Sequence, residues 1–290
     1  MKNGLTLSII FEAESANYGE SLGNITSLKQ ISRSNGEVYT YISRQALRYN
    51  IIQQLNWDNT PVEATGSGDK AVIQFEPKTS ILDYPEIDLF GYMKTEKNKN
   101  AKTRSAVVRL SNAISLEPFN ADMDFLTNMG LASRTTTNNS IAQSEIHKSL
   151  YAYTVTIDLD RVGKDIVNEN VELESEEKIR RVTLFLKTIE FLYRDIRGRR
   201  ENLSPIFAIG GIYDTKCPFF ENRLKLSHHV LDIDLIQAAM EPIKDETLVG
   251  YMNGSLPNDS DIKERLQPLT ILDFFQNLCK KVEEEYHESN

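Results

Sequence analysis

The chain lacks several features that mark common classes of protein. Its 290 residues contain two cysteines, Cys217 and Cys279, which lie too far apart in sequence to suggest a zinc motif or a disulfide framework. No apolar run approaches the ~18 residues of a membrane span. No signal peptide is evident, because Lys2 is followed by strand-like alternation. We therefore expect a cytoplasmic protein without membrane contacts.

An excess of basic charge is also missing. The chain has 33 Lys and Arg against 42 Asp and Glu, a formal net charge of −9, which taken alone argues against a basic nucleic-acid binder. The charges are segregated, however. Basic residues gather at 94–109 and 194–200, and acidic residues gather at 172–177 and 283–288. Two interpretations stay open: an ordinary solvated surface, or a basic groove on an otherwise acidic particle.

Recognisable catalytic motifs are absent as well. The sequence has no Ser-His-Asp, HExxH or phosphate-binding glycine pattern. His228 and His229 could supply a general base for RNA cleavage through the 2′-hydroxyl, but no partner acid or lysine is marked out. Asp158 and Asp160 could bind a metal, although a polar strand end explains them as well. We expect no catalytic residue, no metal and no cofactor.

Hydrophobic periodicity predicts a mixed fold. Alternation favours strands at 5–11, 72–75, 88–93, 105–116, 151–159 and 205–213, the first with one face buried; helical spacing favours helices at 43–55, 175–196 and 268–286, and residues 14–40 look like a long loop. This order suggests an α+β, ferredoxin-like fold. Without a clean linker or repeat, residues 1–290 are best described as a single elaborated domain.

The helix predicted at 43–55 carries a candidate anion site. Arg44 and Arg48 are four residues apart and share a face, where two like charges cost roughly 0.2–0.5 kcal/mol. A bound phosphate would remove this penalty, and Ser43 with the free N–H groups of the first turn could cradle it. Gln45 could add a sugar or base contact. Spacing alone leaves open that both arginines are solvated or paired with acids.

Two further features are ambiguous. Gly210 and Gly211 interrupt an apolar strand, where they could let a phosphate backbone approach closely or simply form a bulge. Residues 119–150, with Met123, Met129 and a polar Thr/Asn run, offer little to a core. They predict a protruding finger or a flexible surface loop.

Four segments resemble a known family. The stretches 10–20, 39–49, 88–93 and 104–114 are similar to the CRISPR-associated Cst/DevR family, the Cas-seven backbone subunit of type I-B Cascade. The resemblance is densest in the first ~120 residues and fades after about 215. It implies a modified RNA-recognition palm with a finger insertion at about 60–104 and a thumb hairpin at about 119–150.

The resemblance also implies a function. Such subunits stack head to tail along a guide CRISPR RNA and present it to target DNA, with other copies and other Cascade subunits as partners. The position matching Ser43, Arg44, Gln45 and Arg48 grips the guide backbone, and Met129 is a candidate wedge in the thumb. With the basic and glycine positions, the candidate RNA-binding residues are Ser43, Arg44, Gln45, Arg48, Arg33, Arg104, Arg109, Met129, Gly210 and Gly211.

The family pattern also bears on catalysis. Type III relatives cleave RNA with an aspartate in the loop after the first strand, whereas 14–40 here holds Glu14, Glu20 and Glu37 but no aspartate. This departure favours a non-catalytic scaffold. The alternative is a repeat-processing endoribonuclease of related fold using His228 or His229. A transcriptional regulator has no helix-turn-helix signature to support it.

Overall fold

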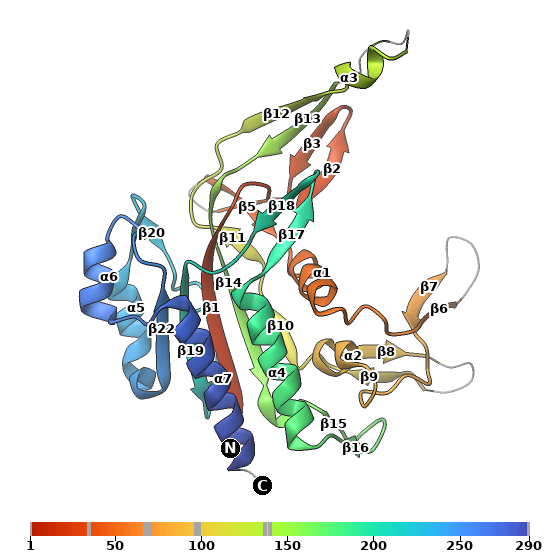
Figure 1. Cartoon of the computed structure of the whole chain (residues 1–290), viewed down its shortest axis with the longest axis vertical. Coiled ribbons are helices and arrows are strands. Elements are labelled where there is room, and N and C mark those ends of the chain that lie inside the picture. The colour runs from red at the N-terminus through yellow and green to blue at the C-terminus, as the bar shows by residue number, and fades with distance from the viewer. Residues whose placement is uncertain are drawn as a thin grey trace.

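A large antiparallel sheet forms the centre of the molecule, and a long hairpin stands at one end of it (Figure 1). The computed structural model describes residues 2–33, 36–65, 71–95, 100–135, 138 and 141–288. The prediction of a fold that mixes helices and strands is confirmed.

Eight strands make up the central sheet in the described residues, with β10 pairing beside β11 on β14. Every pairing within it is antiparallel. In spatial order the strands are β22 (Thr247–Tyr251), β19 (Phe207–Tyr213), β1 (Gly4–Ala13), β14 (Ser149–Asp158), β11 (Ala113–Ser115) with β10 (Val108–Leu110), β5 (Val38–Ile42) and β4 (Gln30–Ser32).

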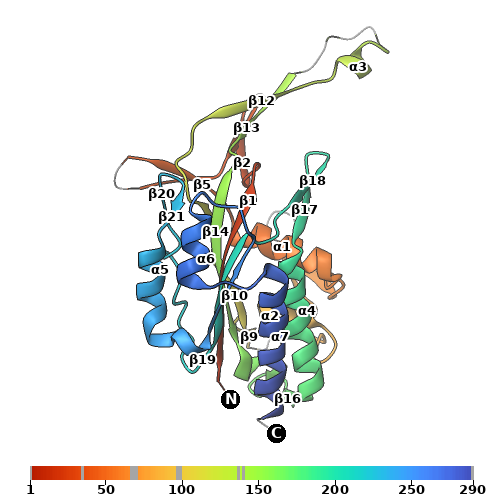
Figure 2. The same cartoon turned by 60° about the vertical axis from the view of Figure 1, so that its left-hand side comes forward.

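Helices cover the two faces of this sheet unequally. The helices α1 (Arg44–Leu55), α4 (Ser175–Glu190) and α7 (Ile271–His287) pack on one face. On the other face, α5 (Ile233–Met240) and α6 (Asp259–Leu266) pack over β19 and β22. The short 3₁₀ helix η3 (Glu241–Glu246) directly follows α5 in the chain. Figure 2 shows the two groups on opposite sides of the sheet. The sheet half that contains β10, β11 and β14 is therefore less covered on its second face.

The strand β1 is buried on both faces rather than on one, so that part of the prediction is wrong. Leu5, Leu7 and Ile9 point into the core beneath α4 and α7. Ile10 joins the second core, which α5 and α6 complete. These two helices were not predicted, and they cover the face that a single strand pattern assigned to solvent.

The protruding hairpin has its own small sheet. Four strands and a short helix build it: β12 (Asp122–Thr127), β13 (Ile141–Ile146), β3 (Ile25–Leu28), β2 (Tyr18–Leu22) and α3 (Met129–Ala132). The predicted loop at 14–40 is therefore wrong, because β2, β3 and β4 lie within it. Backbone groups there pair with the hairpin strand β13, a partner more than a hundred residues away that no local pattern reveals.

Short ladders and turns complete the fold. They are β6 (Val62–Thr65) with β7 (Val72–Phe75), β8 (Tyr92–Lys94) with β9 (Lys102–Arg104), β15 (Lys164–Asp165) with β16 (Val171–Glu172), β17 (Tyr193–Ile196) with β18 (Arg199–Asn202), β20 (Leu226–Ser227) with β21 (Val230–Leu231), the helix α2 (Pro85–Phe90) and the turn η2 (Leu159–Arg161). The strand predicted at 88–93 is partly wrong: Asp88 to Phe90 belong to α2, where Pro85 occupies the first turn.

Candidate nucleic-acid groove

A groove of about 980 Å³ opens on the less covered face of the sheet. Its floor comes from β10, β11 and β14, and one wall comes from the segment 214–226 that follows β19, which we call the arm. Phe220 and Leu224 anchor the arm in the second core. The Thr6 hydroxyl also donates to the Cys217 carbonyl at 3.1 Å. The arm is thus a packed wall.

The lining of this groove is strongly basic. Six described lining residues are cationic and one, Glu221, is acidic; the cations are Arg33, Arg44 and Arg109 on the sheet side and Lys216, Arg223 and Lys225 on the arm. The chain as a whole carries a net charge of −9. Charge is therefore segregated in three dimensions, which produces a local positive field that attracts polyanions.

The groove floor is built from small polar side chains. Ala152, Thr154 and Thr156 alternate along β14 on this face. The hydroxyls of Ser8 and Thr154 lie 2.7 Å apart, and Thr154 N–H donates to Ser111 at 2.9 Å. Three aromatic residues also line the groove: Tyr153 and Phe220 are buried, and the Arg33 guanidinium lies 4.5 Å over one face of the half-buried Tyr39 ring.

The helix α1 begins as predicted, but its first turn is not an open phosphate cradle. Ser43 is the N-cap: its hydroxyl accepts from Ala46 N–H at 3.3 Å and donates to Asn17 Oδ1 at 2.5 Å. Arg44 N–H donates to Asn112 Oδ1 at 2.9 Å. Protein acceptors therefore already occupy two of these N–H groups, as well as the Ser43 hydroxyl.

The two arginines of α1 are separated by their surroundings. The Arg44 side chain is exposed and lines the groove. Arg48 lies outside the lining: it pairs with Glu86 at 3.6 Å and stacks over Phe90 at 4.8 Å. Burial lowers the pKa of Arg48, and the Glu86 charge opposes that shift. Of the two arginines the structure therefore places only Arg44 in the groove, and Gln45, although exposed, is also outside the lining.

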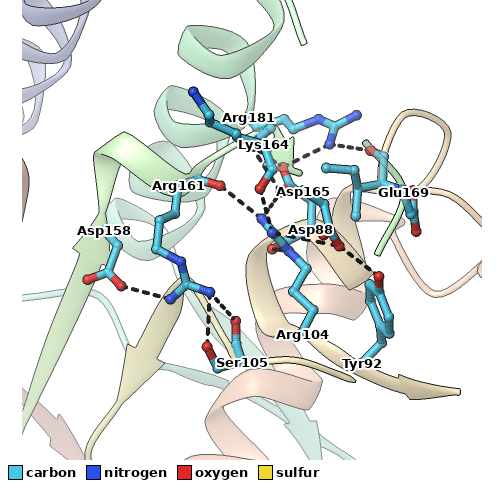
Figure 3. Close-up of polar contacts among 12 residues, drawn as sticks. Asp88, Tyr92, Arg104, Ser105, Asp158, Arg161, Lys164, Asp165, Glu169 and Arg181 are labelled. Atoms are coloured by element: carbon cyan, nitrogen blue, oxygen red, sulfur yellow. Dashed lines mark hydrogen bonds and ion pairs between the residues drawn. The ribbon is translucent and has the colours of Figure 1, made fainter. Parts of the chain in front are cut away.

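Arg104 has a structural environment. Its guanidinium is buried, donating to Asp88 Oδ1 at 2.7 Å and to the carbonyls of Lys164 and Arg161 at 2.6 and 2.8 Å (Figure 3). Arg181, also buried, binds the other Asp88 oxygen at 2.9 Å. The donors of Arg104 therefore join α2 to η2 and β15, and its side chain lies outside the groove lining.

The paired glycines serve strand packing. A Cβ on Gly210 would lie 2.1 Å from the Thr6 carbonyl oxygen, and one on Gly211 would lie 2.2 Å from the Glu246 carbonyl oxygen. Both residues are buried within β19. A close approach does require these glycines, and the neighbour in each case is the protein's own backbone.

Other predicted positions are dispersed. Met129 is 65% exposed and begins α3, the short helix at the far end of the protruding hairpin in Figure 1. Within the basic segment 94–109, Lys97 and Lys99 lie outside the described residues.

The histidines do not gather at the groove. His228 and His229 form the turn between β20 and β21 with positive φ angles of 51° and 65°, and His229 Nδ1 lies 2.5 Å from Glu117. Neither is among the described lining residues. His147 is buried against Thr40 at 2.7 Å, and burial lowers its pKa.

The described residues form neither a metal-binding cluster nor a membrane-spanning helix. In the described part of the chain, no group of three or more His, Cys, Asp or Glu side chains could hold a metal ion. Across the same residues, no helix has the length and apolar character needed to cross a membrane.

Sequence reasoning missed the arm. Lys216, Arg223 and Lys225 supply half of the groove cations, although the predicted site named none of them. The signal was weak, because Glu221 and four apolar or aromatic residues are interspersed. Only the folding of this segment back across β14 aligns the three cations with Arg44 and Arg109.

Comparisons with known protein families agree on one assignment. The family model described as "CRISPR-associated negative auto-regulator DevR/Csa2" matches residues 5–225. A curated protein of Myxococcus xanthus (strain DK1622), "CRISPR-associated protein Cas7/Cst2/DevR", is 31% identical over 159 residues, which is 49% of this chain and 52% of that protein. The chain thus spans about half the length of the curated relative that it matches.

Solved structures support the fold. A chain from a "CRISPR RNA-guided surveillance complex" matches with a TM-score of 0.58 over 99% of this chain and all of that chain, at 12% identity. A chain from a complex described as "pre-nicking" gives the same TM-score and identity over 87% and 93%. At this identity the likeness establishes the architecture alone.

Proposed function

The chain belongs to the CRISPR-associated DevR/Csa2 family, and from this premise we propose that it is a guide-RNA-binding backbone subunit of a type I-B surveillance complex. One observation carries the proposal: six cations line a single groove in a chain whose net charge is −9. Phosphate contacts from Lys and Arg dominate the affinity of proteins for nucleic acid. The groove concentrates such contacts on one face.

The groove floor favours recognition of the RNA backbone over the bases. Proteins that read single-stranded bases stack them on aromatic rings. Here Tyr153 and Phe220 are buried and Arg33 covers Tyr39, while the floor offers Thr154 and small neighbours. A strand held through its phosphates leaves its base edges free to pair with a target. Binding of this kind tolerates any guide sequence.

A modified RNA-recognition palm is the fold that we propose for the core. Its elements follow the order β1, α1, β10 with β11, β14, α4, β19, and the four strand positions lie as β19, β1, β14, β10/β11. Antiparallel strands arranged as fourth, first, third and second define the ferredoxin-like arrangement. The groove then lies on the sheet face that such palms leave uncovered by their two helices.

Two projections would serve as finger and thumb in this scheme. Residues at about 60–104 hold the β6–β7 and β8–β9 ladders, and residues at about 119–150 hold the β12–β13 hairpin. The hairpin exposes Phe125, Leu126 and Met129, each more than 60% accessible. We propose that this apolar hairpin contacts another copy head to tail. Such heterologous contacts generate open helical filaments.

The subunit would hold RNA without cutting it. His228 and His229, the bases that an endoribonuclease of related fold would need, lie outside the described groove lining, and His229 is engaged with Glu117. In this proposal, other subunits process the guide and cut the target. Target DNA would meet the protein through the guide.

A gel-shift series tests this function. Purified protein is mixed with labelled, unstructured single-stranded RNAs of several sequences and lengths, and the RNA is then examined for cleavage. We expect shifts that are independent of sequence, weaken with salt and gain steps with RNA length, with intact RNA. Cleavage at one position of repeat RNA would instead assign an endoribonuclease and direct attention to His228 and His229.

A further inference from the structure

Arg109 is held at the groove rim by a carboxylate on the neighbouring strand. It lies on β10 opposite Thr156 of β14, and Asp158 lies two residues further along the same face. Diagonal neighbours on one sheet face are within reach of long side chains. Arg109 Nη1 and Nη2 donate to the two Asp158 oxygens at 3.0 and 2.9 Å, a bidentate pair. This geometry fixes the guanidinium plane.

Asp158 is also bound by a second arginine, Arg161. Its side chain is 8% exposed, and Arg161 donates to Asp158 Oδ2 at 3.1 Å while also binding Ser105 (Figure 3). Burial alone would raise the pKa of Asp158, but the hydrogen bond and charge of Arg109, the charge of Lys216 and the hydrogen bond from Arg161 together lower it. The carboxylate therefore stays ionised at neutral pH.

A second ion pair, between Lys216 and Asp160, lies beside the first at the same end of the groove. Lys216 on the arm lies 2.5 Å from Asp160 Oδ1 and 3.9 Å from Asp158 Oδ1. Arg109 and Lys216 thus both lie near Asp158, although Arg109 belongs to the sheet and Lys216 to the arm.

The two cations keep free donors despite these pairs. A guanidinium has five N–H groups and an ammonium has three. Among the described residues, Arg109 uses two donors on Asp158 and Lys216 uses one on Asp160, so three and two remain. The cluster holds three cations, Arg109, Arg161 and Lys216, against two carboxylates, so positive charge is in excess, and Arg109 and Lys216 present it to the groove.

From this geometry we propose that Asp158 and Asp160 are positioning residues, which hold Arg109 and Lys216 as one phosphate subsite at this end of the groove. The inference rests on the proposed RNA-binding function and names the ligand of this part of the groove, a single backbone phosphate. An arginine whose plane is already fixed loses less freedom when it binds an anion.

The rival account treats the two carboxylates as charges that compete with phosphate. Both accounts place Arg109 near RNA, and they differ in the sign of its coupling to Asp158. If Asp158 positions Arg109, removing the carboxylate should reduce what Arg109 contributes to binding. If Asp158 merely competes, removing it should free Arg109 to contribute more.

A double-mutant cycle on the full chain separates these accounts. Binding of labelled single-stranded RNA is measured for wild type, Arg109→Ala, Asp158→Asn and the double variant. We expect Arg109→Ala to weaken binding about tenfold in the wild type, the loss of one charge-assisted hydrogen bond. In the Asp158→Asn background we expect about twofold or less. An equal or larger loss in that background overturns the proposal.

A second cycle covers the case in which Asp158→Asn does not fold. Asp160 is 40% exposed at its side chain, so Asp160→Asn should be tolerated, and it is crossed with Lys216→Ala. The control is Asp195→Asn, which breaks an exposed ion pair to Arg200 outside the described lining and should leave RNA affinity unchanged.

Failure of the subsite is distinguishable from failure of the groove. If Arg44→Ala and Arg223→Ala weaken binding but neither cycle shows coupling, the subsite alone is refuted. If no groove variant changes the affinity for RNA, the proposed function itself is refuted.

Discussion

Removing two groove cations should change how strongly salt weakens RNA binding. Arg44 lines the groove on the sheet side and Arg223 lines it on the arm, and no ion pair of the described residues involves either side chain. For single strands, log K falls against log[salt] with a slope of about −0.7 per neutralised phosphate. If Arg109 and Lys216 share one phosphate and each of the other four groove cations meets one, five phosphates are neutralised and the expected slope is about −3.5. The Arg44→Ala/Arg223→Ala variant should give about −2.

Fluorescence anisotropy with a labelled RNA between about 50 and 200 mM salt resolves these slopes. Across that range the wild type should lose about 130-fold in affinity and the variant about 20-fold. Arg180→Ala/Arg265→Ala is the control, because it makes the same change in net charge at two ion-paired positions outside the described lining. Its slope should equal that of the wild type. Equal slopes for all three proteins would refute the groove as the phosphate site.

Three further predictions concern stability. Arg104→Ala leaves the buried Asp88 without one partner and should lower the free energy of unfolding by about 3–5 kcal/mol, measured by urea denaturation. Gly210→Ala places a Cβ 2.1 Å from the Thr6 carbonyl, so it should yield misfolded protein or a loss of at least about 1–3 kcal/mol in the same assay. Burial lowers the pKa of His147 in the folded state, so the unfolded chain binds the proton more readily as pH falls through about 6.5. The melting temperature should therefore drop as pH falls through this range. His147→Gln should reduce that drop.

Local patterns predicted the elements with the clearest signals. The helix predicted at 43–55 forms as Arg44–Leu55 with Ser43 as its N-cap. Two local signals indicate the same helix: the capping hydroxyl of Ser43, and the apolar residues Leu47 and Ile51 at helical spacing. The C-terminal helix forms as Ile271–His287, where Thr270 is the N-cap and apolar residues at helical spacing are buried. The helix predicted at 175–196 ends earlier, at Glu190, where β17 follows three residues later.

The site was less accessible from sequence, because pairing partners are distant along the chain. Arg104 and Arg109 look alike in a basic segment. The first is neutralised by Asp88, which Arg181 also binds from 93 residues away, whereas the second faces the groove. Nothing in the sequence near Arg48 indicates its pairing with Glu86, which lies 38 residues away. Charge segregation in the sequence leaves a basic groove open beside an ordinary solvated surface, and only the tertiary fold decides which cations lie together.

The location of bound RNA is the most direct test of the central claim. Ultraviolet crosslinking of a single-stranded RNA to the full chain, followed by mass spectrometry, identifies the peptides in contact. We predict crosslinks in the arm, 214–226, and in 109–116 of the groove floor, on one face of the sheet. Crosslinks confined to α4 and α7, on the opposite face, would contradict the account.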